Sequence, residues 1–311
     1  MPEGRCGTIR SLAASGSPAP GIVPAVTKSF PTGRPTDMDA AGARWIALHE
    51  ARCHALTSRE VRDLGDGVLL YDSSDREPFW NRIAGMAWPA ASGAFDNRLA
   101  EVIALFASLD RLPHFWPSPG FDEPPDLTAR LLAHGFEDLG AGMLMALDGA
   151  VAKLDVGAAS DAHLTIERLD GGVAQAADPG PTAKGIAAVL AEAFTIEPVQ
   201  ADSIEADTKV ALGNPYFHAI LVRVDGEPAA TVRRTTFDDA SYLSSIGTRP
   251  QFRGRGLGGL VTSLATQDAL DAGSGLTYLG VFADNGVARR LYERLGFVAL
   301  GEPGADLLLF R

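Results

Sequence analysis

The chain of 311 residues is 46% hydrophobic and 21% charged, which excludes a mostly disordered protein. Its length predicts two domains at roughly 100–200 residues each, and no stretch approaches the ~18–20 unbroken apolar residues of a membrane span. The net charge of −12 disfavours nucleic-acid binding and suits a cationic or amine-bearing partner. We expect a soluble, cytoplasmic protein with no nucleic-acid or membrane partner, as a monomer or homodimer.

The N-terminal segment is rich in Ser, Pro, Gly and Thr, and it predicts a disordered tail at residues 1–37. Met38 stands directly before the first helical pattern, so translation from Met38 is an alternative interpretation. Cys6 and Cys53 are not at metal-ligand spacing. We therefore expect no metal site and a reducing compartment.

From Ala41 onward, apolar residues recur at helical and strand spacing. Trp45, Leu48 and Ala51 predict one face of an amphipathic helix that runs to about Leu56. The remaining elements of a first domain, residues 38–150, are expected in this order: strands at 67–71 and 79–83, a helix at 96–109, a strand at 114–116, a helix at 126–134, and two strands of which the second is 143–147.

Residues 151–162 lack periodicity and predict a linker before a second domain at 163–311. Its expected elements are strands at 164–169, 218–224, 229–236, 241–248, 276–282, 297–300 and 306–310, with helices at 183–194, 256–272 and 286–295. The pair Asp225-Gly226 predicts a hairpin turn. This order predicts fold class α/β (α+β), with a mixed, mainly antiparallel sheet flanked by helices in each domain.

Two short segments repeat within the chain. Gly135-Phe136-Glu-Asp-Leu139-Gly140 and Gly296-Phe297-Val-Ala-Leu300-Gly301 match at Gly, Phe, Leu and Gly, 161 positions apart. Both follow a predicted helix and precede predicted strands. The repeat indicates two copies of one fold.

The segment at 251–259, Gln-Phe-Arg-Gly-Arg-Gly-Leu-Gly-Gly, lies between a predicted strand and a long helix. Glycines expose backbone N–H groups, and at a helix N-terminus these favour a diphosphate. Arginines add charge-assisted contacts to phosphate oxygens. The same letters satisfy a dinucleotide fingerprint, but only 52 residues follow Gly259, too few for the further βα units that a dinucleotide fold requires.

Two motifs resemble those of the GCN5-related N-acetyltransferase (GNAT) family. Arg253-x-x-Gly256-x-Gly258 resembles its acetyl-coenzyme A signature, Arg/Gln-x-x-Gly-x-Gly/Ala, and residues 284–297 resemble a second family motif at the expected distance. The resemblance is close over residues 164–311. It implies a tandem GNAT protein with acetyl-coenzyme A (acetyl-CoA) as co-substrate.

The resemblance also implies the site residues. It places coenzyme A contacts at Ile246, Thr248, Arg253, Gly254, Arg255, Gly256, Leu257, Gly258 and Asn285. It makes Tyr292 the acid that protonates the leaving thiolate, although a tyrosine within an amphipathic helix is often a core residue. Backbone N–H groups of the central strand would stabilise the oxyanion.

The base that takes a proton from the acceptor amine is less clear. Many family members have a glutamate four residues before the position of Thr248, and Ser244 stands there instead. Proton removal through ordered water, with Ser244 or Ser245 in the path, is one alternative. The other candidates are Asp238, Asp239, Glu197, Glu205 and His218.

The first copy differs where the chemistry takes place. Residues 89–98 replace the glycine–arginine loop and contain one glycine, and Leu131 stands opposite Tyr292 at the 161-residue offset. We therefore expect a degenerate N-terminal copy that binds no coenzyme A, and an N-acetyltransferase acting on an amine of a small molecule or peptide by direct attack. The alternative is a non-catalytic acyl-CoA-binding or regulatory protein.

Overall fold

A computed structural model describes residues 35–57, 59–149, 152–154, 163–172, 180–196 and 198–310. The predicted tail up to residue 34 and most of the predicted linker lie outside these ranges; the last residues of the predicted tail, Pro35–Asp37, form a short 3-10 helix. The first half contains α1 (Ala40–His54), β1 (Glu60–Asp63), β2 (Val68–Tyr71), a 3-10 helix (Pro78–Trp80), β3 (Arg82–Ala84), α2 (Ser92–Ser108), β4 (His114–Trp116), α3 (Leu127–Ala133) and β5 (Glu137–Leu147).

The second half repeats this scheme with one additional strand before its first helix and one additional helix after it. It contains β6 (Leu164–Asp170), α4 (Gly180–Phe194), α5 (Pro198–Ala211), β7 (Phe217–Val224), β8 (Glu227–Phe237), β9 (Ala240–Thr248), a 3-10 helix (Pro250–Phe252), α6 (Leu257–Asp271), β10 (Leu276–Phe282), α7 (Gly286–Leu295), β11 (Phe297–Ala299) and β12 (Gly304–Leu308). No helix in the described ranges is long and apolar enough to cross a membrane.

Most predicted elements are confirmed, and four differ. The predicted strand at 79–83 begins only at Arg82, because residues 78–80 form a 3-10 helix. The two strands expected before residue 147 are one continuous strand, β5. Strand β1 and helix α5 were not predicted. The hairpin at Asp225-Gly226 is confirmed: both residues have positive φ, 51° and 82°, as a type I′ turn requires.

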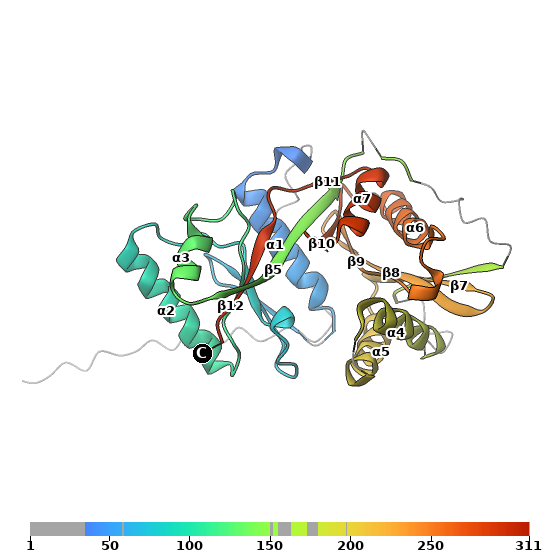
Figure 1. Cartoon of the computed structure of the whole chain (residues 1–311), viewed down its shortest axis with the longest axis horizontal. Coiled ribbons are helices and arrows are strands. Elements are labelled where there is room, and N and C mark those ends of the chain that lie inside the picture. The colour runs from blue at the N-terminus through green and yellow to red at the C-terminus, as the bar shows by residue number, and fades with distance from the viewer. Residues whose placement is uncertain are drawn as a thin grey trace, which may run out of the picture.

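One continuous twelve-stranded sheet runs through both halves, in the order β1-β2-β3-β4-β12-β5-β10-β9-β8-β7-β6, with β11 on β5 (Figure 1). Only β3–β4 and β9–β10 pair in parallel among these described strands, so the expected mainly antiparallel sheet is confirmed. The expectation of a separate sheet in each domain is wrong, because the terminal strands are exchanged between the halves.

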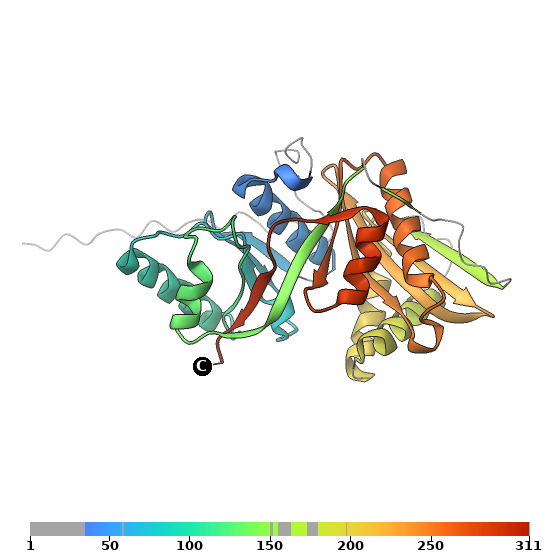
Figure 2. The ribbon, with the colours of Figure 1, turned by 45° about the horizontal axis from the view of Figure 1, so that its top comes forward.

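The exchange is reciprocal. β12, the last strand of the chain, lies between β4 and β5, and its Leu307 packs into the core of the first half with Phe115 and Leu131. In return, β5 lies between β10 and β11, where Met143 and Met145 pack into the core of the second half. Each half therefore needs a strand of the other to complete its sheet (Figure 2).

Alternating side chains bury the two faces of the second-half sheet. Ile220 and Val222 face α6, whereas Ala219 and Leu221 face α4 and α5, as the two-residue period of a strand dictates. Helix α1 bridges the halves, because Ile46 packs with residues of β9 and β10 while Ala51 packs against β2. The arrangement leaves the middle of the sheet, at β9 and β10, between α6 and α7 on one face and α1 and α4 on the other.

Candidate active site

Strands β9 and β10 begin as a parallel pair and then separate. Their register runs from Leu276↔Ala240 to Leu279↔Leu243 and stops there. Beyond this point β9 continues only along β8, as far as Thr248, while β10 continues along β5 up to Phe282. The separation opens a split in the sheet whose edges carry unpaired backbone groups from β9 and β10.

Strand β9 contains a bulge at the start of the split. The β8–β9 register shifts between Thr231↔Gly247 and Arg233↔Ser244, so one residue of β8 faces two residues of β9. Ser245 lies in this bulge with a positive φ of 52°, an uncommon conformation for a residue other than glycine. Bulges re-aim backbone groups next to active sites, and here the peptide groups at Ser245 turn where the two strands part.

The glycine–arginine loop leads from the end of β9 into α6. Gly254 and Gly256 have positive φ values of 77° and 78°, which glycine adopts at little cost. Gly256 is also the N-cap of α6, and without a side chain it cannot accept from the first N–H groups of the helix. A Cβ at either glycine would meet nothing within 4 Å. The loop therefore presents backbone N–H donors and the positive end of the helix dipole to open space.

The two arginines of the loop have different surroundings. The guanidinium of Arg253 donates to the carbonyls of Thr248 (3.2 Å) and Ala193 (3.1 Å), so it ties the loop to β9 and to the end of α4. Arg255 is exposed and lies over the ring of Phe252, 5.6 Å from its centroid. Of the two predicted contacts, Arg253 is therefore held by backbone carbonyls, and Arg255 lies against an aromatic ring.

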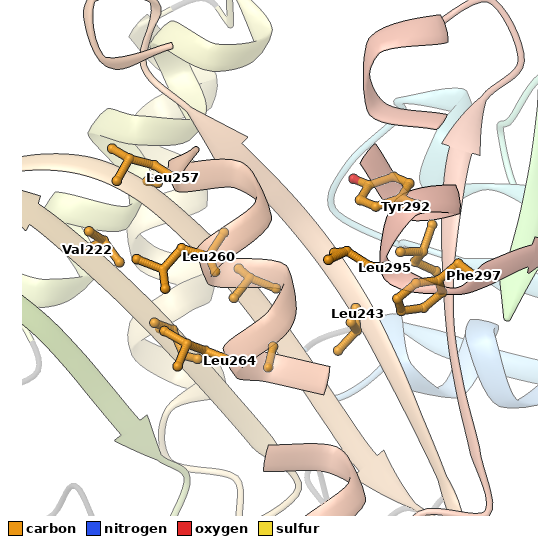
Figure 3. Close-up of a cluster of buried hydrophobic side chains, with 14 of the residues drawn as sticks. Val222, Leu243, Leu257, Leu260, Leu264, Tyr292, Leu295 and Phe297 are labelled. Atoms are coloured by element: carbon orange, nitrogen blue, oxygen red, sulfur yellow. The ribbon is translucent and has the colours of Figure 1, made fainter. Parts of the chain in front are cut away.

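Helix α7 carries the second predicted motif. Asn285 is its N-cap, and the side-chain oxygen accepts from the N–H of Ala288 at 3.1 Å. Tyr292 is 5% exposed, and burial raises the pKa of its hydroxyl, so the phenol stays protonated at neutral pH. Figure 3 shows Tyr292 on the opposite side of Leu243 from Leu257 and Leu260 of α6, with its hydroxyl pointing toward α6. Tyr292 is thus both a core residue, as the alternative interpretation held, and a neighbour of the split.

The remaining predicted coenzyme A contacts lie on β9 beyond the bulge. Ile246 packs at the edge of the α6-side core. Thr248 pairs with Ala230 of β8, and its hydroxyl lies 3.5 Å from where a Cβ of Gly258 would stand. The strand end and the first turn of α6 are therefore in direct contact.

The candidate bases are spread over the molecule. Ser244 lies at the bulge, opposite Arg233, whose guanidinium donates to Thr208 of α5. Asp238 and Asp239 form the β8–β9 turn with positive φ, and Asp239 stands six residues before Ser245, roughly 20 Å away at ~3.3 Å per residue. They are too far away to act at the split.

The other candidates are also engaged elsewhere. Asp238 forms an ion pair with Arg52 at 2.5 Å, and Glu205 forms one with Lys209 at 2.5 Å. His218 lies on β7, two strands from β9, 3.0 Å from Asp170. Glu197 lies outside the described residues.

Sequence reasoning missed a tyrosine beside the split. Tyr242 lies on the same face of β9 as Ser244, and its hydroxyl is 3.6 Å from where a Cβ of Gly280 would stand on β10. Gly280 is the first β10 residue beyond the parallel pairing with β9. The two-residue period of the strand carried the signal, because it places Tyr242 and Ser244 on one face.

These features fit coenzyme A. The open loop at the N-terminus of α6 suits a diphosphate, and the unpaired edge of β9 beyond Leu243 suits an extended amide-bearing chain such as pantetheine, by the strand-addition mode of peptide recognition. Within the described residues no group of three or more His, Cys, Asp or Glu side chains is placed to hold a metal ion.

The corresponding region of the first half is closed by internal hydrogen bonds. After β3, the N–H of Met86 donates to the carboxylate of Asp122 (3.1 Å), and its carbonyl accepts from Glu123 (2.9 Å). The N–H of Trp88 donates to the carbonyl of Glu123 (2.9 Å), and the Trp88 ring is buried against Phe115. The backbone groups that form an open edge in the second half are thus already satisfied here.

Comparisons with known proteins point to one family. The model of the Acetyltransferase (GNAT) family matches residues 185–297. A mycothiol acetyltransferase of Streptomyces scabiei is 32% identical over 125 residues, which are 39% of this chain and 41% of that protein. The chain therefore spans about two fifths of the length of that curated relative.

Solved structures share the fold over most of the chain. A GCN5-related N-acetyltransferase from Kribbella flavida has a TM-score of 0.59 at 24% identity, covering 87% of this chain and 94% of that one. A tandem GNAT protein from the clavulanic acid biosynthesis pathway has a TM-score of 0.57 at 16% identity, covering 88% and 96%. At these identities the likeness concerns the fold alone. The segment that the GNAT family model matches contains the split, the loop and α7, so this part of the chain is similar to that family.

Proposed function

We propose that this chain is an acetyl-CoA-dependent N-acetyltransferase that transfers an acyl group to an amine of a small molecule or peptide by direct attack. The observation that carries the proposal is the split between β9 and β10 beside the open N-terminus of α6. It offers an unpaired strand edge and a diphosphate-binding loop next to each other. A co-substrate with a diphosphate and an amide-bearing arm needs both.

The residues have separate tasks in this proposal. The N–H groups of residues 254–258 and the Arg255 guanidinium hold the diphosphate, and β9 from Ile246 to Thr248 aligns the pantetheine arm. The bulge at Ser245 supplies backbone N–H groups to the developing oxyanion. Tyr292, kept neutral by burial, gives its proton to the departing sulfur. Acetyl-CoA itself supplies the activated acyl group.

In this proposal only the second half binds acetyl-CoA. Residues 163–311 form the catalytic domain and residues 38–150 a degenerate copy, joined by the linker at 151–162. The closed hydrogen bonding around Asp122 supports this division, because a bound pantetheine arm would have to displace it. The completed sheet supports a structural role for the first half, since β5 forms part of the second-half core.

The acceptor is proposed only by class. An excess of acidic over basic side chains, 39 against 27, favours a cationic amine. Because a curated relative is named mycothiol acetyltransferase, the amine precursor of mycothiol belongs in the first panel of acceptors, with aminoglycosides, aminosugars and peptide N-termini. The protein is expected in the cytoplasm, without a metal, as a monomer or homodimer.

A non-catalytic acyl-CoA-binding protein is the second candidate. The observation in its favour is Ser244, which cannot act as the carboxylate base expected at that position. Calorimetric binding and thiol release from acetyl-CoA with the amine panel separate the two functions. Acetyl-CoA binding with amine-dependent thiol release supports the enzyme. Binding without release for every amine supports the binding protein, and absence of binding overturns both.

A further inference from the structure

Helix α1 ends in a carboxylate–imidazole pair that the proposed function does not use. Glu50 and His54 lie one turn apart, and their Oε1 and Nε2 atoms are 2.8 Å apart. An ionised carboxylate only accepts hydrogen bonds, so Nε2 must carry the proton, which leaves Nδ1 with a lone pair. The pair therefore fixes the imidazole tautomer that can accept a proton at Nδ1.

The carboxylate of this pair is held ionised. Both oxygens of Glu50 accept from the guanidinium of Arg82 on β3, at 2.7 Å each. Burial alone would raise the pKa of Glu50, but Arg82 and His54 outweigh it and bring the pKa to about 2. Arg82 in turn stacks on the ring of Trp116 at 3.8 Å. A fixed negative charge therefore faces His54 and stabilises an imidazolium whenever one forms.

His54 lies beside the split, on the face opposite α6. Its ring meets the ring of Tyr242 edge-on, with centroids 5.5 Å apart and an interplanar angle of 82°. The Tyr242 hydroxyl reaches Gly280, just past the point where β10 leaves β9. The imidazole therefore contacts a tyrosine whose hydroxyl lies beside the split.

The protonation state of His54 suits a proton acceptor. Its pKa is lowered, first by burial and then by the cations Arg82 and Arg59, against the opposing effect of Glu50. The imidazole is therefore neutral at pH 7. The side chain is 13% exposed, and its ring also packs against Phe79 and Trp80.

We infer that His54, oriented by Glu50, is the general base that takes a proton from the acceptor amine, in place of the carboxylate that Ser244 lacks. This inference rests on the proposed N-acetyltransferase function. It assigns the first half a catalytic contribution, because α1 belongs to that half and the acyl donor is held by the second.

The protons balance in this scheme. An alkylammonium carries three N–H protons, and one passes to Nδ1 of His54 before nitrogen attacks the thioester carbon and the carbon–sulfur bond breaks. Tyr292 gives its proton to the sulfur, and a second amine proton restores the Tyr292 hydroxyl. The third remains on the amide nitrogen, and His54 returns its proton to water.

The test combines His54→Gln with a pH profile. Glutamine keeps an N–H donor for Glu50 but has no basic nitrogen. With an amine that the wild type acetylates, kcat at pH 7 should fall roughly 10²-fold. The defect should shrink as the pH approaches ~10, because an alkylamine is then partly free and needs no base. The matched control is His134→Gln in the same half, whose ring lies 3.3 Å from Asp96 and is 40% exposed; its kcat should not change.

A second readout needs neither a variant nor turnover. Nitrogen-15 NMR of the imidazoles in the wild-type protein should show His54 as the Nε2–H tautomer, with a pKa below the ordinary histidine value of ~6.5. A His54 that carries its proton on Nδ1, a His54→Gln enzyme within twofold of wild type, or a loss of equal size at every pH overturns the inference. Each of these three results can be obtained while the wild-type chain still acetylates an amine, so each one contradicts the role of His54 without contradicting the proposed function. A wild-type chain that acetylates no amine overturns the proposed function instead, and this inference with it.

Discussion

The segments that follow β3 in the first half and β9 in the second half have the same order of elements but differ in how their backbone groups are satisfied. After β9 the strand edge is unpaired with β10 and the loop N–H groups face open space. After β3 the edge is bonded to the Asp122 carboxylate and to the backbone of Glu123. Gly256 caps α6, whereas Ala91 stands before α2.

The comparison shows that the same fold can leave a strand edge open to a ligand or close it with its own hydrogen bonds. A few polar groups decide between the two. Buried or half-buried backbone groups must find partners, and in the first half the chain provides them itself. In the second half the pairing of β9 with β10 stops at Leu243, and the described strands leave that edge open. The buried Trp88 replaces the open space that a coenzyme arm needs, so the difference is one of packing as well as hydrogen bonding.

Removing the proposed acid should have the largest effect on activity. In Tyr292→Phe we expect kcat to fall roughly 10²-fold, because the sulfur then leaves without a proton donor, while the affinity for acetyl-CoA stays within twofold. Steady-state kinetics and calorimetry measure the two quantities. The matched change in the first half, Tyr71→Phe, removes a hydroxyl on β2 and should leave kcat unaltered. An unchanged kcat in Tyr292→Phe would remove Tyr292 from the acid role.

A methyl group at the helix N-cap should weaken coenzyme binding by a smaller factor. Gly256→Ala places a Cβ in the open space beside the loop and should lower acetyl-CoA affinity about tenfold or more, together with roughly 1–2 kcal/mol of strain from the positive φ. Gly135→Ala is the control for strain, since Gly135 also has a positive φ, 90°, with nothing within 4 Å. Equal losses of acetyl-CoA affinity in both variants would contradict the assignment of the loop.

The closed loop of the first half should give the protein a pH-dependent stability. Burial raises the pKa of Asp122 to about 7, against the opposing hydrogen bonds from the N–H groups of Ser118 and Met86. An unfolded aspartate has a pKa of ~3.9, so the protonated form is favoured by folding. The resulting stability is present below pH ~4 and is lost as the pH rises to about 7.

The measurement compares thermal unfolding of the wild type and Asp122→Asn from pH 4 to 8. The free-energy advantage of the wild type over the variant should fall by a few kcal/mol across this range, by about 1.4 kcal/mol per unit of pKa difference. A constant difference between the two proteins would show that Asp122 titrates normally and does not form the buried closure described above.

The sequence predicted the elements around the site well, and for a physical reason. β10 and α7 occur at the predicted residues, because a short apolar run, the Asn285 cap and the Gly296 terminus are local signals. Helix α5 was missed since its acidic and apolar residues form no clear stripe. Two strands were predicted where the structure has β5, because Gly140 and Gly142 interrupt the pattern. Pairing with β10 and β12 keeps this segment in one continuous strand.

The strand exchange and the surroundings of His54 could not be predicted from the sequence, because no local pattern of residues encodes them. Both copies carry the same Gly-Phe-x-x-Leu-Gly pattern, so periodicity alone does not decide which copy fills which place in the sheet. Glu50 and His54 are one helical turn apart in the sequence, but their proximity to Tyr242 depends on packing between elements almost 190 residues apart.

Hydrogen exchange with and without acetyl-CoA tests the central claim, that only the second half holds the coenzyme, most directly. On saturation, amides in peptides covering residues 246–259 should exchange more slowly, while those covering residues 84–93 should not change. Protection at residues 84–93, or no protection at residues 246–259 while acetyl-CoA is bound, would contradict this account.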